Sequence, residues 1–169
     1  MKKGMIILMI FFTSVFAFSS SWENFVPEEY VEFLQILCYE YKVPVEIVAA
    51  IGTVESNWRN TAVNFNSNNS NDIGIFQLNS NYIDYFEDNF WHNPYEEFDP
   101  INPYHNIEIA VKYLKWLRLN TNSWEEAVVS YNVGINAVKR KEKMDSQIDY
   151  LTKVISVMVN FNQEEENAY

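Results

Sequence analysis

Apolar residues recur at helical spacing through much of the chain, and prolines or polar stretches separate one such segment from the next. Pro27 precedes the first segment, whose apolar residues fall on one side of a helix: Val31, Leu34, Cys38 and Tyr41. Pro44 disfavours helical geometry at the residue before it, so the first helix should end there. We expect a second helix from about Val45 to Asn57.

Three more helices are predicted in the second half of the chain. Asn102 precedes an apolar stripe over residues 106–120, and Ser123 begins a capping box that opens a short helix. Gly134 provides the exit from that helix, because glycine adopts left-handed geometry at low cost. A last helix is expected over residues 146–161, with an apolar stripe made of Ile148, Leu151, Ile155 and Met158.

The segment that follows the second predicted helix is polar. From Asn57 to Asn71 it is rich in Asn and Ser, whose side chains compete with the backbone for hydrogen bonds. We expect a loop or a short β-hairpin there. The chain has no internal repeat and no linker, so the pattern predicts one mainly α domain over residues 21–163 with an irregular or β-hairpin segment. A polar tail, residues 164–169, should follow.

The first twenty residues have the three parts of a secretory signal peptide. Lys2 and Lys3 provide positive charge, residues 5–18 are mostly apolar, and small residues follow up to Ser20. The apolar run is shorter than the roughly 20 residues that a bilayer-spanning helix needs. We therefore expect a cleaved signal over residues 1–20 and no stable membrane insertion afterwards. An uncleaved N-terminal anchor is the alternative.

Composition and charge exclude several classes of function. The 12 basic and 23 acidic side chains give a net charge of −11, and no basic run is long enough to follow a nucleic-acid backbone. The single cysteine excludes an intrachain disulfide, and no HExxH or phosphate-binding glycine motif is present. His92 and His105 are expected at the surface or at helix caps. No metal and no organic cofactor are expected, and an acidic exported protein fits the periplasm or cell envelope of a bacterium.

Glu55 carries the most distinctive candidate chemistry. It falls at the end of the second predicted helix, after an apolar stretch and just before the polar segment. Loss of solvation raises the pKa of a carboxyl group, so such a residue can stay protonated near neutral pH and donate a proton. The alternative is an ordinary solvated glutamate at a helix end, and the neighbouring motifs favour the catalytic interpretation.

Four ordered motifs resemble a known family. They are Glu55-Ser56-Asn57-Trp58, Asp72-Ile73-Gly74-Ile75-Phe76-Gln77, Pro103-Tyr104-His105-Asn106 and Ser130-Tyr131-Asn132-Val133-Gly134. This order resembles the SLT group of lytic transglycosylases, which have a lysozyme-like helical fold with the cleft beside the polar segment. Within that group it is most similar to the small specialised enzymes of secretion and conjugation machines. The resemblance spans residues 41–154.

The resemblance implies roles for residues that match the family motifs. Glu55 is expected to be the catalytic acid and then the base, with Tyr131 facing it across the cleft. Gln77 would line the cleft floor and hydrogen-bond the sugar. Asn132 would hold neighbouring backbone or substrate, and Ser56 would form a hydrogen bond near the catalytic group. The alternative for Tyr131 and Asn132 is a structural helix end.

Gly74 and Phe76 complete the expected substrate-binding set. Gly74 should lie where the backbone runs close to the glycan, so that a Cβ would crowd the sugar. Phe76 is one of several aromatic residues expected in or near loops beside the cleft, because flat rings suit the faces of pyranose sugars. The others are Trp58, Tyr82, Tyr85, Phe90, Trp91 and Tyr104. Trp116 and Trp124 are expected in the core.

Asp72 departs from the usual family pattern. Asn71-Asp72 stands where the family has Gly-Ala, and the seventeen-residue step from Glu55 to Asp72 instead matches animal-type lysozymes. In those enzymes the second carboxylate is a nucleophile or an electrostatic stabiliser. Asp72 is therefore a candidate catalytic residue, with an Asx-turn residue that orders the polar loop as the alternative. The lysozyme disulfides are absent, which favours the transglycosylase branch.

The resemblance implies cleavage of the β-1,4 bond between N-acetylmuramic acid and N-acetylglucosamine in peptidoglycan. Glu55 would protonate the glycosidic oxygen and then take a proton from the muramic C6 hydroxyl, which attacks C1 and leaves a 1,6-anhydro end. A muramidase that uses Glu55 and Asp72, and a non-catalytic glycan-binding envelope protein, are the alternatives. An envelope-spanning secretion or motility machine is a candidate partner, and we expect a monomer.

Overall fold

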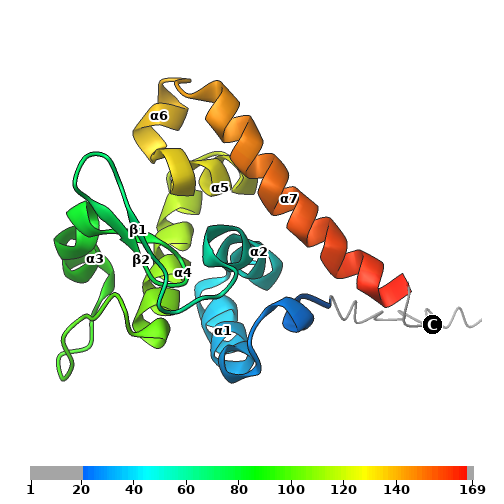
Figure 1. The fold of residues 1–169 in the computed structure, drawn as a ribbon, viewed down its shortest axis with the longest axis horizontal. Coiled ribbons are helices and arrows are strands. Elements are labelled where there is room, and N and C mark those ends of the chain that lie inside the picture. Colours follow the sequence, from blue (N-terminus) through cyan, green and yellow to red (C-terminus); the bar gives the residue numbers. More distant parts are fainter. Residues whose placement is uncertain (1–20, 167–169) are drawn as a thin grey trace, which may run out of the picture.

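The computed structural model describes residues 21–166, so the predicted signal segment 1–20 and the last residues 167–169 lie outside the described part. The α-helices within it are α1 (Glu28–Tyr41), α2 (Val45–Ser56), α3 (Ile83–Phe90), α4 (Pro103–Leu119), α5 (Trp124–Val133), α6 (Ile135–Lys139) and α7 (Met144–Glu166). In Figure 1 the small sheet and α3 lie on one side of the molecule and the long helix α7 lies on the other. The mainly α fold is confirmed.

The polar segment after α2 forms the first two strands of a small antiparallel sheet. Strands β1 (Val63–Phe65) and β2 (Asn71–Ile73) make a hairpin, and β3 (Leu78–Asn79) pairs with the other edge of β2. In this register Asp72 lies opposite Asn64 on one side and opposite Asn79 on the other. The expected hairpin is present, and it places Asp72 on the central strand.

Turn and cap residues set the helix boundaries. The chain turns at Lys42, which has a φ of 56°, and α2 begins directly after Pro44. The side chains of Asn102 and Ser123 accept backbone hydrogen bonds in the first turns of α4 and α5. Gly134 links α5 to α6 at a φ of 84°. These boundaries agree with the predictions, whereas α3 and α6 have no counterpart among the predicted helices.

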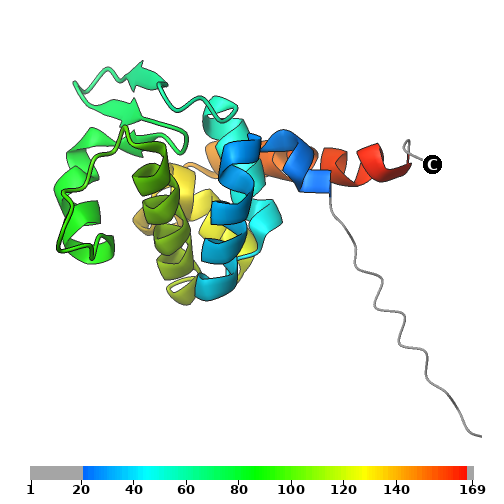
Figure 2. The same ribbon diagram turned by 90° about the horizontal axis from the view of Figure 1, so that it is seen from below.

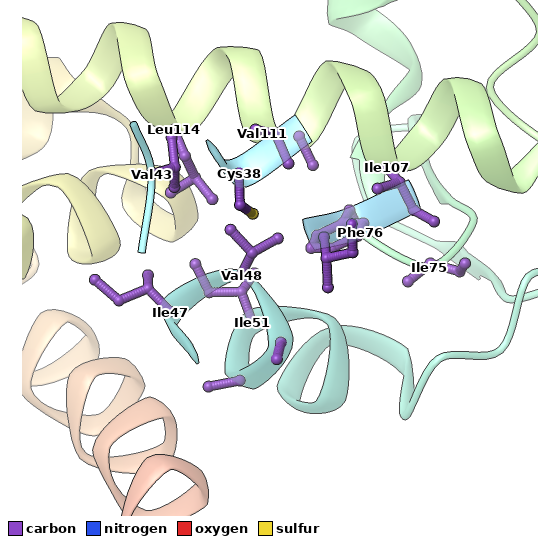
Figure 3. Packing of buried hydrophobic residues seen from close by; sticks show 14 of the residues in the cluster. Cys38, Val43, Ile47, Val48, Ile51, Ile75, Phe76, Ile107, Val111 and Leu114 are labelled. Atoms are coloured by element: carbon purple, nitrogen blue, oxygen red, sulfur yellow. The ribbon is translucent and has the colours of Figure 1, made fainter. Parts of the chain in front are cut away.

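Helix α2 lies at the centre of the core. Its residues Val48 and Ile51 pack with Phe76 from the turn after β2 and with Ile107 and Leu114 from α4, and all five side chains are fully buried (Figure 3). Burying a side chain of this size contributes roughly 1.5–3 kcal/mol. The core therefore fixes the carboxyl end of α2 against α4 and the turn after β2.

The face that helix α7 turns to the core coincides only in part with the predicted stripe, of which Leu151 and Met158 pack against the core. Tyr150, Val154 and Phe161 are buried, whereas Ile148 and Ile155 are 57% and 47% exposed. The prediction that Ile148 and Ile155 belong to the buried stripe is therefore wrong. Apolar residues occupy two adjacent stripes of this helix, and spacing alone does not indicate which stripe packs.

Helix α7 connects the amino-terminal segment to the rest of the domain. It packs against α2, α5 and the 3₁₀ helix η1 (Ser21–Phe25), and the Phe25 and Phe161 rings meet edge to face at 4.7 Å. Figure 2 shows the last turns of α7, in red, extending beyond the helical body. Within residues 21–166, no helix has both the length and the apolar character required to cross a membrane.

Candidate active site

A cleft of about 630 Å³ runs beside the sheet, α3, α5 and the turn after α6. Segments that are far apart in the sequence line it, because the core packs them around the carboxyl end of α2. Of the eight residues predicted to be catalytic or substrate-binding, five are among the lining: Glu55, Asp72, Gln77, Tyr131 and Asn132. A cleft of this volume lies in the range of small-molecule binding sites.

Glu55 lies on the last turn of α2, which ends where Asn57 adopts a left-handed conformation with a φ of 53°. The side chain is half-buried, and loss of solvation raises the pKa of Glu55 to about 7. A hydrogen bond from Tyr150 lowers this pKa, the negative charge of Asp72 raises it, and the positive charge of Lys153 lowers it. A carboxyl group with a pKa near 7 can give and take a proton at neutral pH.

Tyr150 is the direct partner of Glu55. Its hydroxyl donates a hydrogen bond to Glu55 Oε1 over 2.5 Å, from a position on α7 that lies 95 residues further along the chain. Burial and the charge of Glu55 raise the pKa of Tyr150 well above its usual value, so the hydroxyl stays a donor. Sequence analysis assigned no role to Tyr150. Its place on the buried stripe of α7 is evident only in the structure, because spacing alone does not fix which stripe packs.

Tyr131 joins α5 to the turn after β2. Its hydroxyl donates a hydrogen bond to the backbone oxygen of Phe76 over 2.8 Å, and its ring packs beside Tyr113. Burial, followed by the charge of Glu55, raises the pKa of Tyr131 well above its usual value. Tyr131 therefore lies within electrostatic reach of Glu55, but its hydroxyl is engaged within the protein, and its role opposite Glu55 stays a prediction. The adjacent Asn132 is exposed on the cleft wall.

Asp72 is held on both sides by amide groups of the polar segment. Its Oδ1 accepts a hydrogen bond from Asn79 Nδ2 over 2.7 Å, and its Oδ2 accepts one from Asn66 Nδ2 over 2.9 Å. Asp72 lines the cleft, and its carboxylate cross-links the hairpin to β3. This geometry supports the loop-ordering interpretation of Asp72, and its role as a second catalytic residue stays a prediction.

Gln77 forms the corner between β2 and β3. It has a φ of 51°, its amide nitrogen donates to the backbone oxygen of Gly74 over 2.7 Å, and its amide oxygen accepts from Asn64 over 2.6 Å. Gln77 lines the cleft. These contacts fix the orientation of its amide, so a bound sugar would meet an amide that is already ordered.

Asn106 is a positioning residue that sequence analysis placed in a motif without a role. It is fully buried on α4, accepts a hydrogen bond from the Phe76 backbone nitrogen over 2.8 Å, and donates to the backbone oxygens of Ile73 and Pro100. A Cβ on Gly74, which has a φ of 76°, would lie 2.5 Å from the Asn106 amide nitrogen. The neighbouring Asn106 therefore requires a glycine at position 74. The expectation that a bound glycan requires it is not supported.

Ser56 and Phe76 do not line the cleft. Ser56 is buried, and its hydroxyl oxygen accepts a hydrogen bond from the Arg59 backbone nitrogen over 3.0 Å at the end of α2. Phe76 is fully buried and packs edge to face with Trp58. The expected contact between the Phe76 ring and a sugar is therefore wrong. Phe76 contributes through its backbone oxygen instead, which accepts the hydrogen bond from the Tyr131 hydroxyl.

The other aromatic residues divide between the cleft and the core. Tyr82 and Tyr85, at the start of α3, line the cleft as expected. Trp116, which was expected in the core, also lines the cleft and stacks on Tyr113. Phe86 and Tyr113, which were not predicted there, also line the cleft. The remaining candidates pack elsewhere: Trp58 and Phe90 in the core, Trp91 against Phe98 and His105, and Tyr104 against Tyr30 and Phe33.

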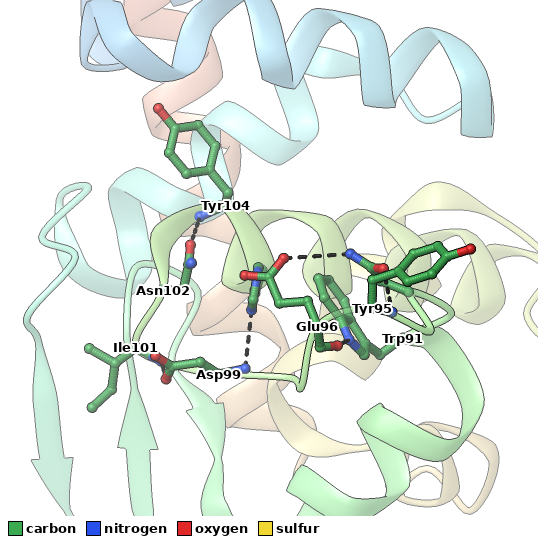
Figure 4. A network of polar contacts seen from close by, with 9 residues as sticks. Trp91, Tyr95, Glu96, Asp99, Ile101, Asn102 and Tyr104 are labelled. Carbon is green, nitrogen blue, oxygen red and sulfur yellow. Dashed lines mark hydrogen bonds and ion pairs between the residues drawn. The ribbon is translucent and has the colours of Figure 1, made fainter.

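His105 is buried on α4, contrary to its expected surface position. Its Nδ1 accepts a hydrogen bond from the Asp99 backbone nitrogen over 3.1 Å, and its Nε2 lies 3.1 Å from a Glu96 carboxylate oxygen. Trp91 donates to the Glu96 backbone oxygen, and Figure 4 shows how these contacts brace the loop between α3 and α4.

Within residues 21–166, no group of three or more His, Cys, Asp or Glu side chains is arranged to hold a metal ion.

Comparison with known proteins identifies the family. The model of the "Transglycosylase SLT domain" family matches residues 34–152, a range that contains Glu55, Tyr131 and Tyr150. The chain belongs to the transglycosylase SLT family. Two relatives, Protein IpgF of Shigella flexneri and Protein IpgF of Shigella sonnei, are each 30% identical to it over 125 residues. Those residues make up 73% of this chain and 79% of each relative.

The SLT fold is also found among solved structures. The X-ray structure of an inactive glutamate-to-glutamine mutant of lytic transglycosylase Slt from Pseudomonas aeruginosa matches with a TM-score of 0.64 and 20% sequence identity. The match covers 83% of this chain and 25% of the Slt chain, so this chain spans about a quarter of the length of Slt. This likeness confirms the lysozyme-like helical fold.

Proposed function

We propose that this SLT-family protein is a peptidoglycan lytic transglycosylase in which Glu55 is the general acid and base. One observation carries the proposal: a half-buried carboxyl group with a pKa raised to about 7 lies on the wall of a cleft of about 630 Å³. Membership of the SLT family supports an enzyme that cleaves peptidoglycan. The bond cleaved would be the β-1,4 bond between N-acetylmuramic acid and N-acetylglucosamine.

The reaction uses Glu55 twice. Its protonated carboxyl gives a proton to the glycosidic oxygen as the bond to muramic C1 breaks, and the substrate's own N-acetyl group stabilises the oxocarbenium-like carbon. The ionised carboxylate then takes the proton of the muramic C6 hydroxyl, which attacks C1. Glu55 is thereby restored, a 1,6-anhydro ring closes, and no water is consumed. The Tyr150 hydroxyl, 2.5 Å from the carboxyl, stabilises the ionised form between the two steps.

A hydrolytic muramidase is the second candidate, because Asp72 lies in the same cleft and its charge acts on Glu55. In that reaction Asp72 would be the nucleophile or the stabiliser of a retaining mechanism. The two amide donors that hold its carboxylate favour a role for Asp72 in ordering the hairpin. We therefore place the transglycosylase first.

The setting of the proposed reaction is the bacterial envelope. Peptidoglycan lies outside the inner membrane, and residues 1–20 have the composition of a secretory signal, so we propose an exported, periplasmic or envelope enzyme. Peptidoglycan glycan strands are then its substrate. An envelope-spanning secretion or motility machine as a partner, and a monomeric state, stay predictions.

Mass analysis of digested cell walls tests the proposal. The wild-type protein should release muropeptides with 1,6-anhydro ends, and Glu55→Gln should reduce turnover at least about 100-fold in a folded protein, because the amide cannot transfer the proton. Products that carry one additional water would instead support the muramidase. Binding to purified sacculi without any cleavage would support a non-catalytic envelope protein. A Glu55→Gln variant with near wild-type turnover would show that the catalytic residue is misassigned.

A further inference from the structure

The turn that joins α6 to α7 concentrates positive charge in an acidic molecule. Residues 139–143 read Lys-Arg-Lys-Glu-Lys, so four cations against one carboxylate give this turn a charge of +3. With a net charge of −11 for the whole chain, the remainder carries −14. All four basic side chains are exposed. We call residues 139–143 the basic turn, and it lies at the top of the molecule in Figure 1, between α6 and the start of α7.

The basic turn contributes to the wall of the cleft that contains Glu55. Arg140, Glu142 and Lys143 line the same cleft as Glu55, and the preceding residues of α6 continue that wall. Asp72 lies in the same cleft. The cleft wall therefore combines the carboxylates of Glu55 and Asp72 with cations from the turn where α6 meets α7.

The backbone of the basic turn is held in a defined conformation. Lys141 and Lys143 have φ angles of 56° and 52°, which are uncommon for residues other than glycine. The side-chain amide of the buried Gln147 donates a hydrogen bond to the Glu142 backbone oxygen over 2.6 Å. The Glu142 backbone nitrogen donates one to the Ala137 backbone oxygen over 2.8 Å. Arg140 forms two hydrogen bonds with the Glu142 carboxylate. These contacts order the turn, and its single carboxylate, Glu142, is paired with Arg140.

We infer that the basic turn binds the carboxylates of the peptides attached to the glycan strand, an inference that rests on the proposed function. In a peptide-bearing strand the N-acetyl groups are neutral, and the lactyl carboxyl of muramic acid is consumed in an amide bond. The negative charge of the substrate therefore lies on its peptides. A +3 turn on the wall of the cleft attracts that charge and favours strands whose peptides carry free carboxylates. Lys143, which lines the cleft, and Lys141, which is exposed in the same turn, are the specificity-determining residues.

The test compares two forms of one substrate. Glycan strands with intact peptides are digested beside strands whose peptide carboxylates have been converted to amides, which removes the charge and keeps the peptide. We expect wild-type kcat/KM to be several-fold higher on the carboxylate form, with the difference lost at high salt. The double variant Lys141→Gln, Lys143→Gln should lose about three- to tenfold on the carboxylate form only, mostly through KM, as expected for two exposed charge contacts.

Lys42→Gln is the matched control. Lys42 is also exposed and has a φ of 56°, but it lies at the end of α1 and does not line the cleft. Its replacement should change neither rate, and melting curves should show that all variants are folded. A double variant that loses activity equally on both substrates, or on neither, would overturn the inference while leaving the proposed function intact. A wild-type protein that cleaves neither substrate would overturn the proposed function and this inference with it.

Discussion

At the scale of single residues, two neighbours act on Glu55 in opposite directions. Burial has the largest effect and raises the pKa of Glu55, the Tyr150 hydroxyl lowers it, and the charge of Asp72 raises it, with a net value of about 7. Because the acid must be protonated, kcat/KM of the free enzyme should fall as pH rises through about 7. The Tyr150 hydroxyl and the Asp72 charge can each be removed by a substitution that changes the shape of the side chain very little. The effect of each on the pKa of Glu55 can therefore be measured.

We predict that Tyr150→Phe moves this alkaline limb to higher pH and that Asp72→Asn moves it to lower pH. The first variant removes a hydrogen bond that stabilises the carboxylate, and the second removes a negative charge that destabilises it. The measurement is kcat/KM against pH for the three proteins, with melting curves recorded alongside. Shifts in the same direction in both variants would contradict the assigned causes.

Asp72→Asn also distinguishes the two reactions. If Asp72 orders the hairpin, its amide should reduce activity by no more than about tenfold, which is the effect of losing one charge-assisted hydrogen bond. If it is a covalent nucleophile, activity should fall almost as far as in Glu55→Gln. We expect the milder result, with anhydro products retained, because both carboxylate oxygens already accept hydrogen bonds from Asn66 and Asn79. Complete inactivation with an unchanged melting curve would favour the muramidase.

The raised pKa of Glu55 also affects stability. In the unfolded chain a glutamate ionises near 4.5, whereas in the native state Glu55 holds its proton up to about 7. Native stability therefore falls as pH rises from about 4.5 to 7, and Glu55→Gln removes that loss. The variant should be more stable than wild type by about 1–3 kcal/mol at pH 8 and nearly equal to it at pH 4, as measured by urea unfolding. Equal stability at both pH values would contradict the burial effect.

At the scale of elements, the apolar residues of α7 differ sharply in how far they are buried. Val154 is 1% exposed and Ile155 is 47% exposed, although they are neighbours in sequence. Val154→Ala should cost about 1–3 kcal/mol of unfolding free energy, because it leaves a cavity against the core. Ile155→Ala removes a larger side chain but should cost less than about 0.5–1 kcal/mol. Denaturant midpoints check this order, and the reverse order would mean that the helix packs through its other face.

The same helix explains why part of the site could not be predicted from the sequence. A stripe of Ile148, Leu151 and Ile155 has the same spacing as the true buried stripe, so the pattern indicates a helix without fixing its rotation. Tyr150 was therefore missed as the partner of Glu55. Glu55 itself was predictable, because its own helix ends in a turn and its neighbours carry recognisable motifs.

At the scale of the whole molecule, the fold class was more predictable than the cleft. Helix boundaries depend on local signals such as Pro44 and Ser123, which act over a few residues. Cleft lining depends on distant contacts, such as the 55-residue step that joins Tyr131 to the Phe76 backbone. For this reason the burial of Phe76 in the core and the position of Trp116 on the cleft wall could not be predicted from the sequence pattern.

The cleft is lined by residues of α2, the sheet, α3, α4, α5 and the turn after α6, and Tyr150 of α7 holds Glu55. It should therefore exist only when the whole domain is folded. A ligand that binds the native state alone stabilises it by about 2.7 kcal/mol at 100 times its Kd. We predict that an uncut fragment of N-acetylglucosamine–N-acetylmuramic acid units, added at that level to Glu55→Gln, raises Tm by roughly 5–10 °C in one cooperative transition. A glucan of the same length without N-acetyl groups is the control and should have a much smaller effect. Measured binding of the wall fragment without any change in Tm would mean that the cleft survives in a part of the chain that unfolds separately, which its long-range contacts argue against.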